Sequence, residues 1–68
     1  MSEVFKSIEL VGTSEKSFDD AVKMAVERAG QTVRDLRWLE VMEQRGNIKD
    51  GKLHEYQTKV RVWFHLHG

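Results

Sequence analysis

Two histidines near the end of the chain have a spacing that could bind a metal ion. His65 and His67 are two residues apart in an alternating segment, so their side chains fall on the same face of a strand. Imidazole nitrogen is the commonest metal ligand in proteins. Two ligands do not close a site, however, and the chain has no cysteine to add a thiolate. From this pattern alone we expect no metal site.

The strand face that carries these histidines also carries a tryptophan, which a sheet facing only water does not need. Trp63 lies on this face with Gln57, and Trp38 lies on the matching face of the preceding strand. Ser, Cys and Tyr nucleophiles are absent from this face. We expect Glu40 to pair with Arg61 rather than to act as an acid or base. The composition favours a binding protein over an enzyme.

The length and composition of the chain restrict its class. Its 68 residues make one domain, 1–68, and a domain this small buries only about 60% of its unfolded surface. Its core is therefore marginal unless disulfides, a metal or oligomerisation reinforce it. The absence of cysteine excludes disulfides and is consistent with a reducing compartment. We therefore expect a homo-oligomer.

Charge and hydropathy argue against two common partners. The 11 basic and 11 acidic residues leave no net charge to attract nucleic acid or an anionic membrane. The apolar runs are too short to span a bilayer or to form a signal peptide. We expect a cytoplasmic protein that binds neither nucleic acid nor membranes.

The clearest structural pattern is an alternation that runs from His54 to Gly68. Side chains on a strand point alternately to opposite faces, so this segment predicts one long half-buried strand. One face carries Tyr56, Thr58, Val60, Val62, Phe64 and Leu66. The opposite face carries Glu55, Gln57, Lys59, Arg61, Trp63, His65 and His67.

Two earlier segments also predict strands. Val4 to Val11 is rich in β-branched and aromatic residues and is expected to end at Gly12-Thr13-Ser14. Leu36 to Arg45 forms the next strand, with Leu39 and Val41 on one face. Both segments are long enough to pair with the last strand.

Apolar residues at three- and four-residue spacing predict an amphipathic helix over 18–29. Ser17 is the expected N-cap, with Asp20 at the acidic position of a capping box. Gly30 is the expected end of the helix. The segment Gln31 to Asp35 could hold one further turn.

Asp50-Gly51 predicts a tight hairpin, because a primed two-residue turn needs positive φ at both central positions. Lys49 then faces Lys52, and a bulge near Glu43 to Gly46 could alter the register near the turn. Continued without a slip, the register matches apolar with apolar and aromatic with aromatic. The matched pairs are Val41–Val60, Leu39–Val62, Trp38–Trp63 and Glu40–Arg61.

The element order is strand, helix, strand, strand. A right-handed crossover makes the first two strands parallel, and the hairpin makes the third antiparallel to the second. The long third strand can pair with both only from the middle. We therefore expect an α+β fold, β-α-β-β, whose three-stranded antiparallel sheet of order 1-3-2 wraps around one amphipathic helix.

Short motifs over nearly the whole chain carry a family resemblance. They are Leu10-Val11-Gly12-Thr13-Ser14, Arg28-Ala29, Trp38 with Glu40-Val41, Arg45-Gly46, Asp50-Gly51 and Tyr56-Gln57. In this order and spacing they resemble the dodecin family of small flavin-binding proteins. The resemblance implies a hollow homododecamer that stacks flavins in pairs between tryptophans of symmetry-related subunits. It implies storage or sequestration of flavin and quenching of its photochemistry, not catalysis; some bacterial members also hold coenzyme A.

The resemblance assigns three residues to the flavin, each with a plainer alternative. Trp38 matches the stacking tryptophan, and the alternative is a tryptophan packed at an interface. Gln57 matches the residue whose amide reads the polar edge of the ring, and the alternative is a solvated strand residue. Arg45 matches a position beside the flavin and also suits a phosphate, whereas an ion pair with Glu43 is the alternative. FMN is the expected flavin, ahead of riboflavin, lumichrome and FAD.

The register separates two of these residues within one chain. Gln57 lies about six residues from the row of Trp38, or roughly 20 Å at ~3.3 Å per residue. One subunit could hardly supply both contacts to one ring. We expect the flavin site to lie between subunits.

A second set of residues could contact the phosphates of coenzyme A, as similar outer-surface positions do in family members that hold it. They are Lys6, Arg28, Thr32, Arg34, Arg37 and His65. Bacterial relatives commonly carry arginine where His65 stands, and a neutral imidazole is a poorer phosphate partner. Scattered solvated charges are the alternative.

Trp63 is a second departure, because relatives usually have Gly or Ala there. It could support Trp38, fill an interface or narrow the flavin pocket. The alternative function is therefore a dodecameric cage of the same fold that binds flavin weakly or not at all and has another ligand, coenzyme A or a metal.

Overall fold

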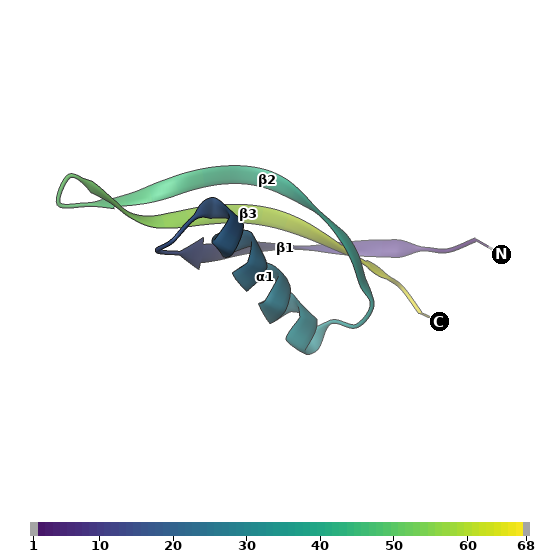
Figure 1. Ribbon diagram of the computed structural model, residues 1–68. Helices are drawn as coiled ribbons and strands as arrows, with labels where there is room; N and C mark the ends of the chain where they lie inside the picture. Colours follow the sequence, from purple (N-terminus) through teal and green to yellow (C-terminus); the bar gives the residue numbers. More distant parts are fainter. Residues whose placement is uncertain (1, 68) are drawn as a thin grey trace.

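The computed structural model describes residues 2–67, which form a three-stranded sheet with one helix across one of its faces (Figure 1). The elements are β1 (Phe5–Ser14), α1 (Phe18–Thr32), β2 (Leu36–Lys49) and β3 (Lys52–His65). The strand order is β1-β3-β2, and β3 pairs antiparallel with both neighbours. The predicted α+β fold and strand order are confirmed.

Strand β3 forms the centre of the core because its side chains alternate between the two faces of the sheet. Thr58, Val60 and Val62 are buried on the face that packs against α1. The buried Thr58 hydroxyl donates a hydrogen bond to the Phe18 carbonyl oxygen at 3.3 Å, which satisfies a polar group inside the core. The predicted alternation of this strand is therefore confirmed.

The ends of β3 and β2 differ from the prediction. β3 ends at His65 rather than continuing towards Gly68, which lies outside the described residues. The Leu66 N–H still donates to the Val4 carbonyl oxygen at 2.8 Å, so the pairing continues for one more hydrogen bond. β2 runs to Lys49 instead of ending near Arg45, because it pairs with β3 as far as the turn.

β1 continues through the residues that were expected to end it. Gly12 serves close packing here rather than a turn, because a Cβ atom at this position would collide with the Ala21 carbonyl group and lie 3.0 Å from the Ala25 Cβ. Ala21 and Ala25 are themselves buried. Small residues on both elements therefore let β1 and α1 approach closely.

The helix begins with the predicted N-cap, but the predicted capping box is only half formed. The Asp20 N–H donates to Ser17 Oγ at 3.0 Å. The Asp20 carboxylate does not return to the Ser17 N–H; it accepts a hydrogen bond from the Ser14 hydroxyl at 2.7 Å. Ser14 thereby ties the end of β1 to the start of α1, and this contact displaces the expected one.

The helix ends later than predicted. It passes through Gly30 to Thr32, and the Val33 N–H donates to the Ala29 carbonyl oxygen at 2.9 Å. The chain then reaches positive φ at Asp35 (64°) rather than at the glycine. Among the described residues α1 is the one helix, and its 15 residues are too few and too polar to cross a membrane.

The β2–β3 register agrees with the prediction at the turn and at the tryptophans. Asp50 (φ 52°) and Gly51 (φ 74°) form the tight turn, as two positive φ angles require. At the other end of the hairpin, Trp38 lies opposite Trp63. Between these points the register is shifted.

Two compensating bulges cause this shift. Near the turn the pairing skips His54 on β3, and further along it skips Met42 on β2. These irregularities flank the range where a bulge was expected. Their effect is to place Arg45 directly opposite Gln57.

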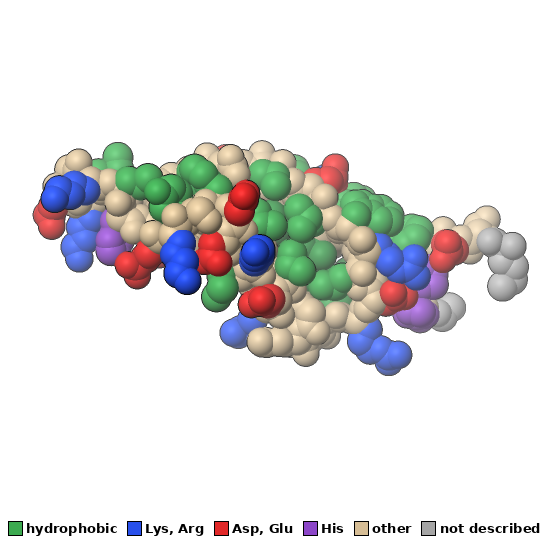
Figure 2. Space-filling view, in the orientation of Figure 1, with side chains coloured by type: hydrophobic (Ala, Val, Ile, Leu, Met, Phe, Trp, Pro, Cys, Tyr) green, Lys and Arg blue, Asp and Glu red, His purple; other side chains and the backbone are tan. Residues whose placement is uncertain are grey.

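The helix packs on β1 and β3 and leaves much of β2 uncovered (Figure 1). Val41, for example, lies opposite the buried Val60 yet remains 50% exposed. Other large apolar side chains are exposed as well: Val4, Val11, Met24, Met42, Ile48, Leu53 and Leu66. Figure 2 shows such side chains spread along the visible face of a molecule that measures 54 × 20 × 13 Å. One chain alone therefore leaves apolar surface that association with other copies would bury.

The packing role of Gly12 can be tested by adding a single methyl group. Gly12→Ala should lower the stability by about 1–3 kcal/mol, because the new Cβ meets backbone that cannot move without shifting α1. Thermal unfolding followed by circular dichroism at fixed protein concentration measures the change.

The matched control adds the same group in the helix. At Gly30 the nearest atom to a new Cβ is Leu36 Cδ1 at 3.9 Å, so Gly30→Ala should stabilise the protein by about 0.5–1 kcal/mol. Equal effects of the two substitutions would show that the close approach at Gly12 is not needed.

Candidate ligand-binding site

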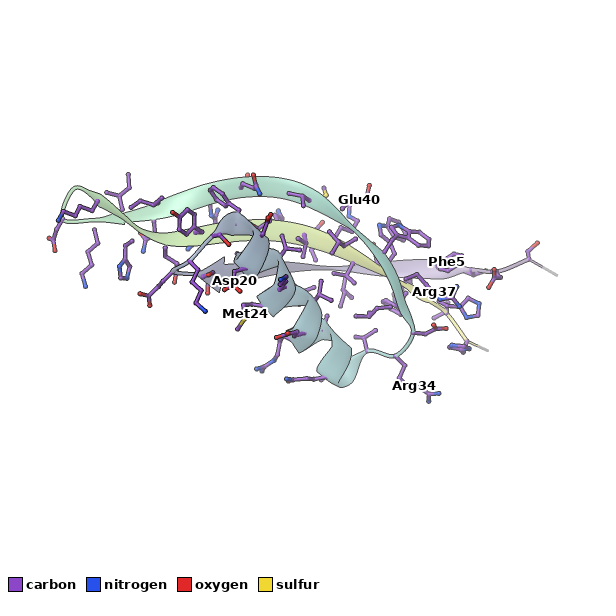
Figure 3. The ribbon with its side chains drawn as sticks, in the orientation of Figure 1. Phe5, Asp20, Met24, Arg34, Arg37 and Glu40 are labelled. Carbon is purple, nitrogen blue, oxygen red and sulfur yellow. The ribbon has the colours of Figure 1, made fainter. Side chains whose placement is uncertain are left out.

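Three aromatic side chains meet on the face of the sheet opposite α1, which we call the outer face. The Trp38 and Trp63 rings are stacked, with their centroids 5.9 Å apart and their planes 21° apart. The Phe5 ring lies 4.8 Å from the Trp38 ring at an angle of 54°, near the end of the sheet where both termini lie (Figure 3). Trp38 nevertheless remains 47% exposed. The indole is thus held in place with part of its surface open to a ligand.

The carboxylate of Glu40, beside this aromatic group, accepts a hydrogen bond from Trp63. The Trp63 Nε1–H donates to Glu40 Oε1 at 2.7 Å, which fixes the orientation of the Trp63 ring. The predicted side-chain pair between Glu40 and Arg61 is therefore wrong, although the two residues lie opposite each other in the register.

Arg61 turns instead to the other neighbour of β3. It donates from Nη2 to Glu9 Oε2 on β1 at 3.2 Å, and Lys59 Nζ lies 3.6 Å from the same carboxylate. The hydrogen bond from Arg61 and the charge of Lys59 lower the pKa of Glu9. The carboxylate is therefore held ionised beside its basic partners and is not poised to exchange protons near neutral pH.

A polar cluster occupies the outer face nearer the turn. Arg45 Nε donates to Gln57 Oε1 at 2.6 Å, and Gln57 Nε2 donates to Glu55 Oε1 at 2.9 Å. Arg45 Nη1 also lies 3.5 Å from Glu43, so the ion pair considered as its alternative role is formed. The structure brings Arg45 and Gln57 together because the bulges place them opposite each other.

The structure keeps these two groups apart within one chain. Gln57 and Trp63 lie on the same face of β3 but are six residues apart, a separation of roughly 20 Å in an extended strand. Trp38 shares the row of Trp63. A single aromatic ring stacked on Trp38 would therefore be too short to reach Gln57 of the same chain.

The residues considered for coenzyme A are divided between several places. Thr32, Arg34 and His65 line one groove of about 430 Å³ where the end of α1 meets the end of β3, and Figure 3 shows Arg34 projecting from this end of the molecule. Arg28 lines a different groove, between α1 and β1. Lys6 lies on β1, opposite Phe64.

Arg37, the remaining member of this set, is held by an acidic neighbour. Its Nε donates to Asp35 Oδ1 at 2.9 Å and its Nη2 donates to Asp35 Oδ2 at 3.3 Å. Its guanidinium also lies 5.7 Å from the centre of the Phe5 ring. These contacts direct it towards the sheet rather than towards a phosphate in the groove.

Asp35 is the residue at this end that the sequence did not single out. Its carboxylate lies 3.0 Å from His67 Nε2 and 3.5 Å from His65 Nδ1. The hydrogen bond from Arg37, followed by that from His67, lowers its pKa to about 2. Asp35 and the histidines lie about 30 residues apart in the chain, so no local spacing reveals the contact.

Comparison with known proteins agrees with this architecture. A family model described as Dodecin matches residues 4–67. The chain is 46% identical over 66 residues to a dodecin from Thermus thermophilus, covering 97% of this chain and 96% of that protein. It is also 35% identical over 63 residues to a protein named calcium dodecin from Mycobacterium tuberculosis, covering 93% and 89%.

The fold is also that of solved dodecins. The structure matches a dodecin from Streptomyces davaonensis with a TM-score of 0.95 and 34% identity over the whole of both chains. With a family model that spans nearly all of its residues, close sequence relatives and the same fold, this chain belongs to the dodecin family.

Proposed function

We propose that this protein stores flavin: it stacks FMN between the Trp38 side chains of symmetry-related subunits and quenches the photochemistry of the bound flavin. The observation that carries the proposal is the Trp38 indole, which is half exposed although two aromatic neighbours hold it. A rigid, exposed aromatic plane suits the flat isoalloxazine ring. Close stacking also permits the electron transfer that quenches an excited flavin.

Arg45 and Gln57 complete this site from a second subunit. The hydrogen bond between them orients the Gln57 amide, whose donor and acceptor suit the pyrimidine edge of a flavin. Arg45 would stand beside the ribityl or phosphate group. Because these residues lie roughly 20 Å along β3 from the tryptophan row, the proposal requires the site to form between chains.

The uncovered apolar surface of β2 supports assembly. Val41 and Met42 are 50% and 44% exposed in the isolated chain. Burying them against another copy would reinforce a domain whose own core is small. Membership of the dodecin family supports a homododecamer as the assembled form.

The chemistry of the outer face favours binding over catalysis. The Glu40 carboxylate accepts the Trp63 N–H, and the Glu9 carboxylate is engaged by Arg61 and Lys59. A general acid or base needs a group free to exchange its proton near the operating pH. We therefore assign this face to flavin storage rather than to turnover.

One observation favours a second candidate, a cage that binds flavin weakly or not at all. Trp63 stacks on Trp38 and so covers part of the surface that the flavin would use. Coenzyme A fits less well as the replacement ligand, because Asp35 places a carboxylate beside the groove of Arg34 and His65. Lys6 does not line that groove.

The role of Trp38 is tested by removing its ring. Trp38→Ala should weaken FMN binding by about 5- to 150-fold, since stacking on one aromatic side chain contributes about 1–3 kcal/mol. Titration of FMN while following the loss of its fluorescence measures the affinity. Light scattering should show that the oligomer remains assembled.

Met24→Ala is the control, because Met24 exposes a similar fraction of an apolar side chain (50%) on α1, on the other side of the sheet. It should leave FMN affinity unchanged. If Trp38→Ala binds FMN as tightly as the parent protein, the stacking site has been assigned to the wrong residue.

The role of Gln57 is tested by a change that spares the stacking surface. Gln57→Ala should lower FMN affinity about 5-fold, because about 1 kcal/mol of net hydrogen bonding is lost. The emission of the bound flavin should stay quenched, since the tryptophans are unchanged. Unaltered affinity would mean that another residue reads the edge of the ring.

A further inference from the structure

Two imidazoles and a carboxylate converge where β3 ends beside the segment that follows α1. His67 Nε2 lies 3.0 Å from Asp35 Oδ2, His65 Nδ1 lies 3.5 Å from the same oxygen, and the two imidazole nitrogens are 3.4 Å apart. Figure 2 shows the purple histidines beside acidic and basic side chains at this end of the molecule. The three atoms therefore form a nearly equilateral triangle.

The three separations match those between neighbouring ligand atoms around a bound metal ion. Zinc binds imidazole nitrogen and carboxylate oxygen at about 2.0–2.2 Å. Two ligand atoms at that distance lie about 3.4 Å apart in a tetrahedral shell and about 3.0 Å apart in an octahedral one. The observed separations of 3.0, 3.4 and 3.5 Å cover this range. One ion could thus contact all three atoms with only small movements.

Backbone contacts hold the carboxylate at this position. Asp35 has a φ of 64°, which non-glycine residues seldom adopt, although aspartate tolerates it better than most. Its carbonyl oxygen accepts the His65 N–H at 3.1 Å. This hydrogen bond ties the two ligands together through the main chain.

Neighbouring side chains orient the ligands. Arg37 donates to both oxygens of Asp35, from Nε to Oδ1 at 2.9 Å and from Nη2 to Oδ2 at 3.3 Å, and Oδ2 is the oxygen that lies within 3.5 Å of both histidines. On the far side of the His65 ring, Nε2 lies 3.5 Å from the Glu3 carboxylate. A carboxylate that accepts a hydrogen bond from the N–H of one ring nitrogen leaves the other nitrogen free to bind a metal, an arrangement common around metal-bound histidine.

We propose that Asp35, His65 and His67 bind a first-row transition-metal dication, with Zn²⁺ as the best fit and water at the remaining position. Two imidazoles with one carboxylate suit zinc and its neighbours in the periodic table, whereas Ca²⁺ and Mg²⁺ take oxygen ligands. The site is therefore chemically different from a calcium site. It does not depend on flavin binding, because its three ligands come from one chain.

A network of hydrogen bonds and ion pairs without metal would use the same contacts. In that case the histidines would be only polar neighbours of Asp35, with Arg37 and Glu3 as the charged groups around them. The two explanations differ in what happens when metal is offered. The metal site predicts stoichiometric binding of Zn²⁺, whereas the ion-pair network predicts none.

The test is calorimetric titration of Zn²⁺ into the untagged full chain at pH 7.5, after removal of flavin and stripping of metal with a chelator. We expect one Zn²⁺ per chain. His67→Ala and Asp35→Asn should each weaken binding by about 100-fold or more, because each removes a ligand. Glu3→Gln should weaken it about 10-fold, as loss of an orienting partner does.

The third histidine of the chain supplies the control. His54 is exposed on β3 near the turn, far from this cluster, so His54→Ala should leave Zn²⁺ affinity and stoichiometry unchanged. Asp35→Asn keeps a residue type that tolerates positive φ, and circular dichroism checks that the variants remain folded. When Co²⁺ is added to the parent protein, it should show the visible absorption of a Co²⁺ ion bound by nitrogen and oxygen. This measurement needs no variant.

Three results would overturn the proposal. One is a parent protein that binds neither Zn²⁺ nor Co²⁺ stoichiometrically. Another is binding that survives in Asp35→Asn and His67→Ala but is lost in His54→Ala, which would place the metal at the turn. Binding of Ca²⁺ that competes equally with Zn²⁺ would likewise contradict the assigned ligand chemistry.

Discussion

Strand β3 is hydrogen-bonded along both of its edges, to β1 on one side and to β2 on the other. A strand in this position has a fixed alternation, because a slip of one residue would turn its buried valines outwards. Val60 and Val62 therefore hold one face against α1, and the residues between and beyond them, Arg61 and Trp63 among them, must lie on the outer face. This alternation places Gln57 and Trp63 on the outer face, and the pairing of β2 with β3, bulges included, places Arg45 and Trp38 opposite them.

The same arrangement leaves part of the sheet uncovered by other elements of the chain. One helix of 15 residues covers β1 and β3 but not the full width of the sheet, so the apolar side chains of β2 stay exposed. The tryptophan pair lies on the opposite, outer face of the same two strands. The need to bury apolar area and the proposal that a flavin lies between subunits therefore both involve β2, on its two different faces.

Much of the fold could be predicted because it depends on local patterns. The alternation of β3, the N-cap at Ser17 and the turn residues near Asp50 each act over a few positions. The exceptions depend on contacts between distant segments. Gly12 lies within β1, where the close approach of α1 leaves no room for a Cβ atom. The bulges place Arg45 opposite Gln57 but leave Trp38 opposite Trp63. Asp35 comes within reach of the histidines only in the folded chain. The ion pair of Arg61 with Glu9 was missed for the same reason. Arg61 lies opposite Glu9 on β1 and Glu40 on β2, and the strand register alone does not decide which carboxylate it contacts.

The most direct test of flavin storage is the visible absorption and fluorescence of the purified protein, before and after heat releases any ligand. The account predicts a yellow protein whose flavin emission is quenched and recovers on release, with chromatography identifying FMN. A colourless protein that also fails to quench added FMN, riboflavin or FAD would contradict it. Trp63 would then close the Trp38 surface, and the cage that does not bind flavin would be the correct description.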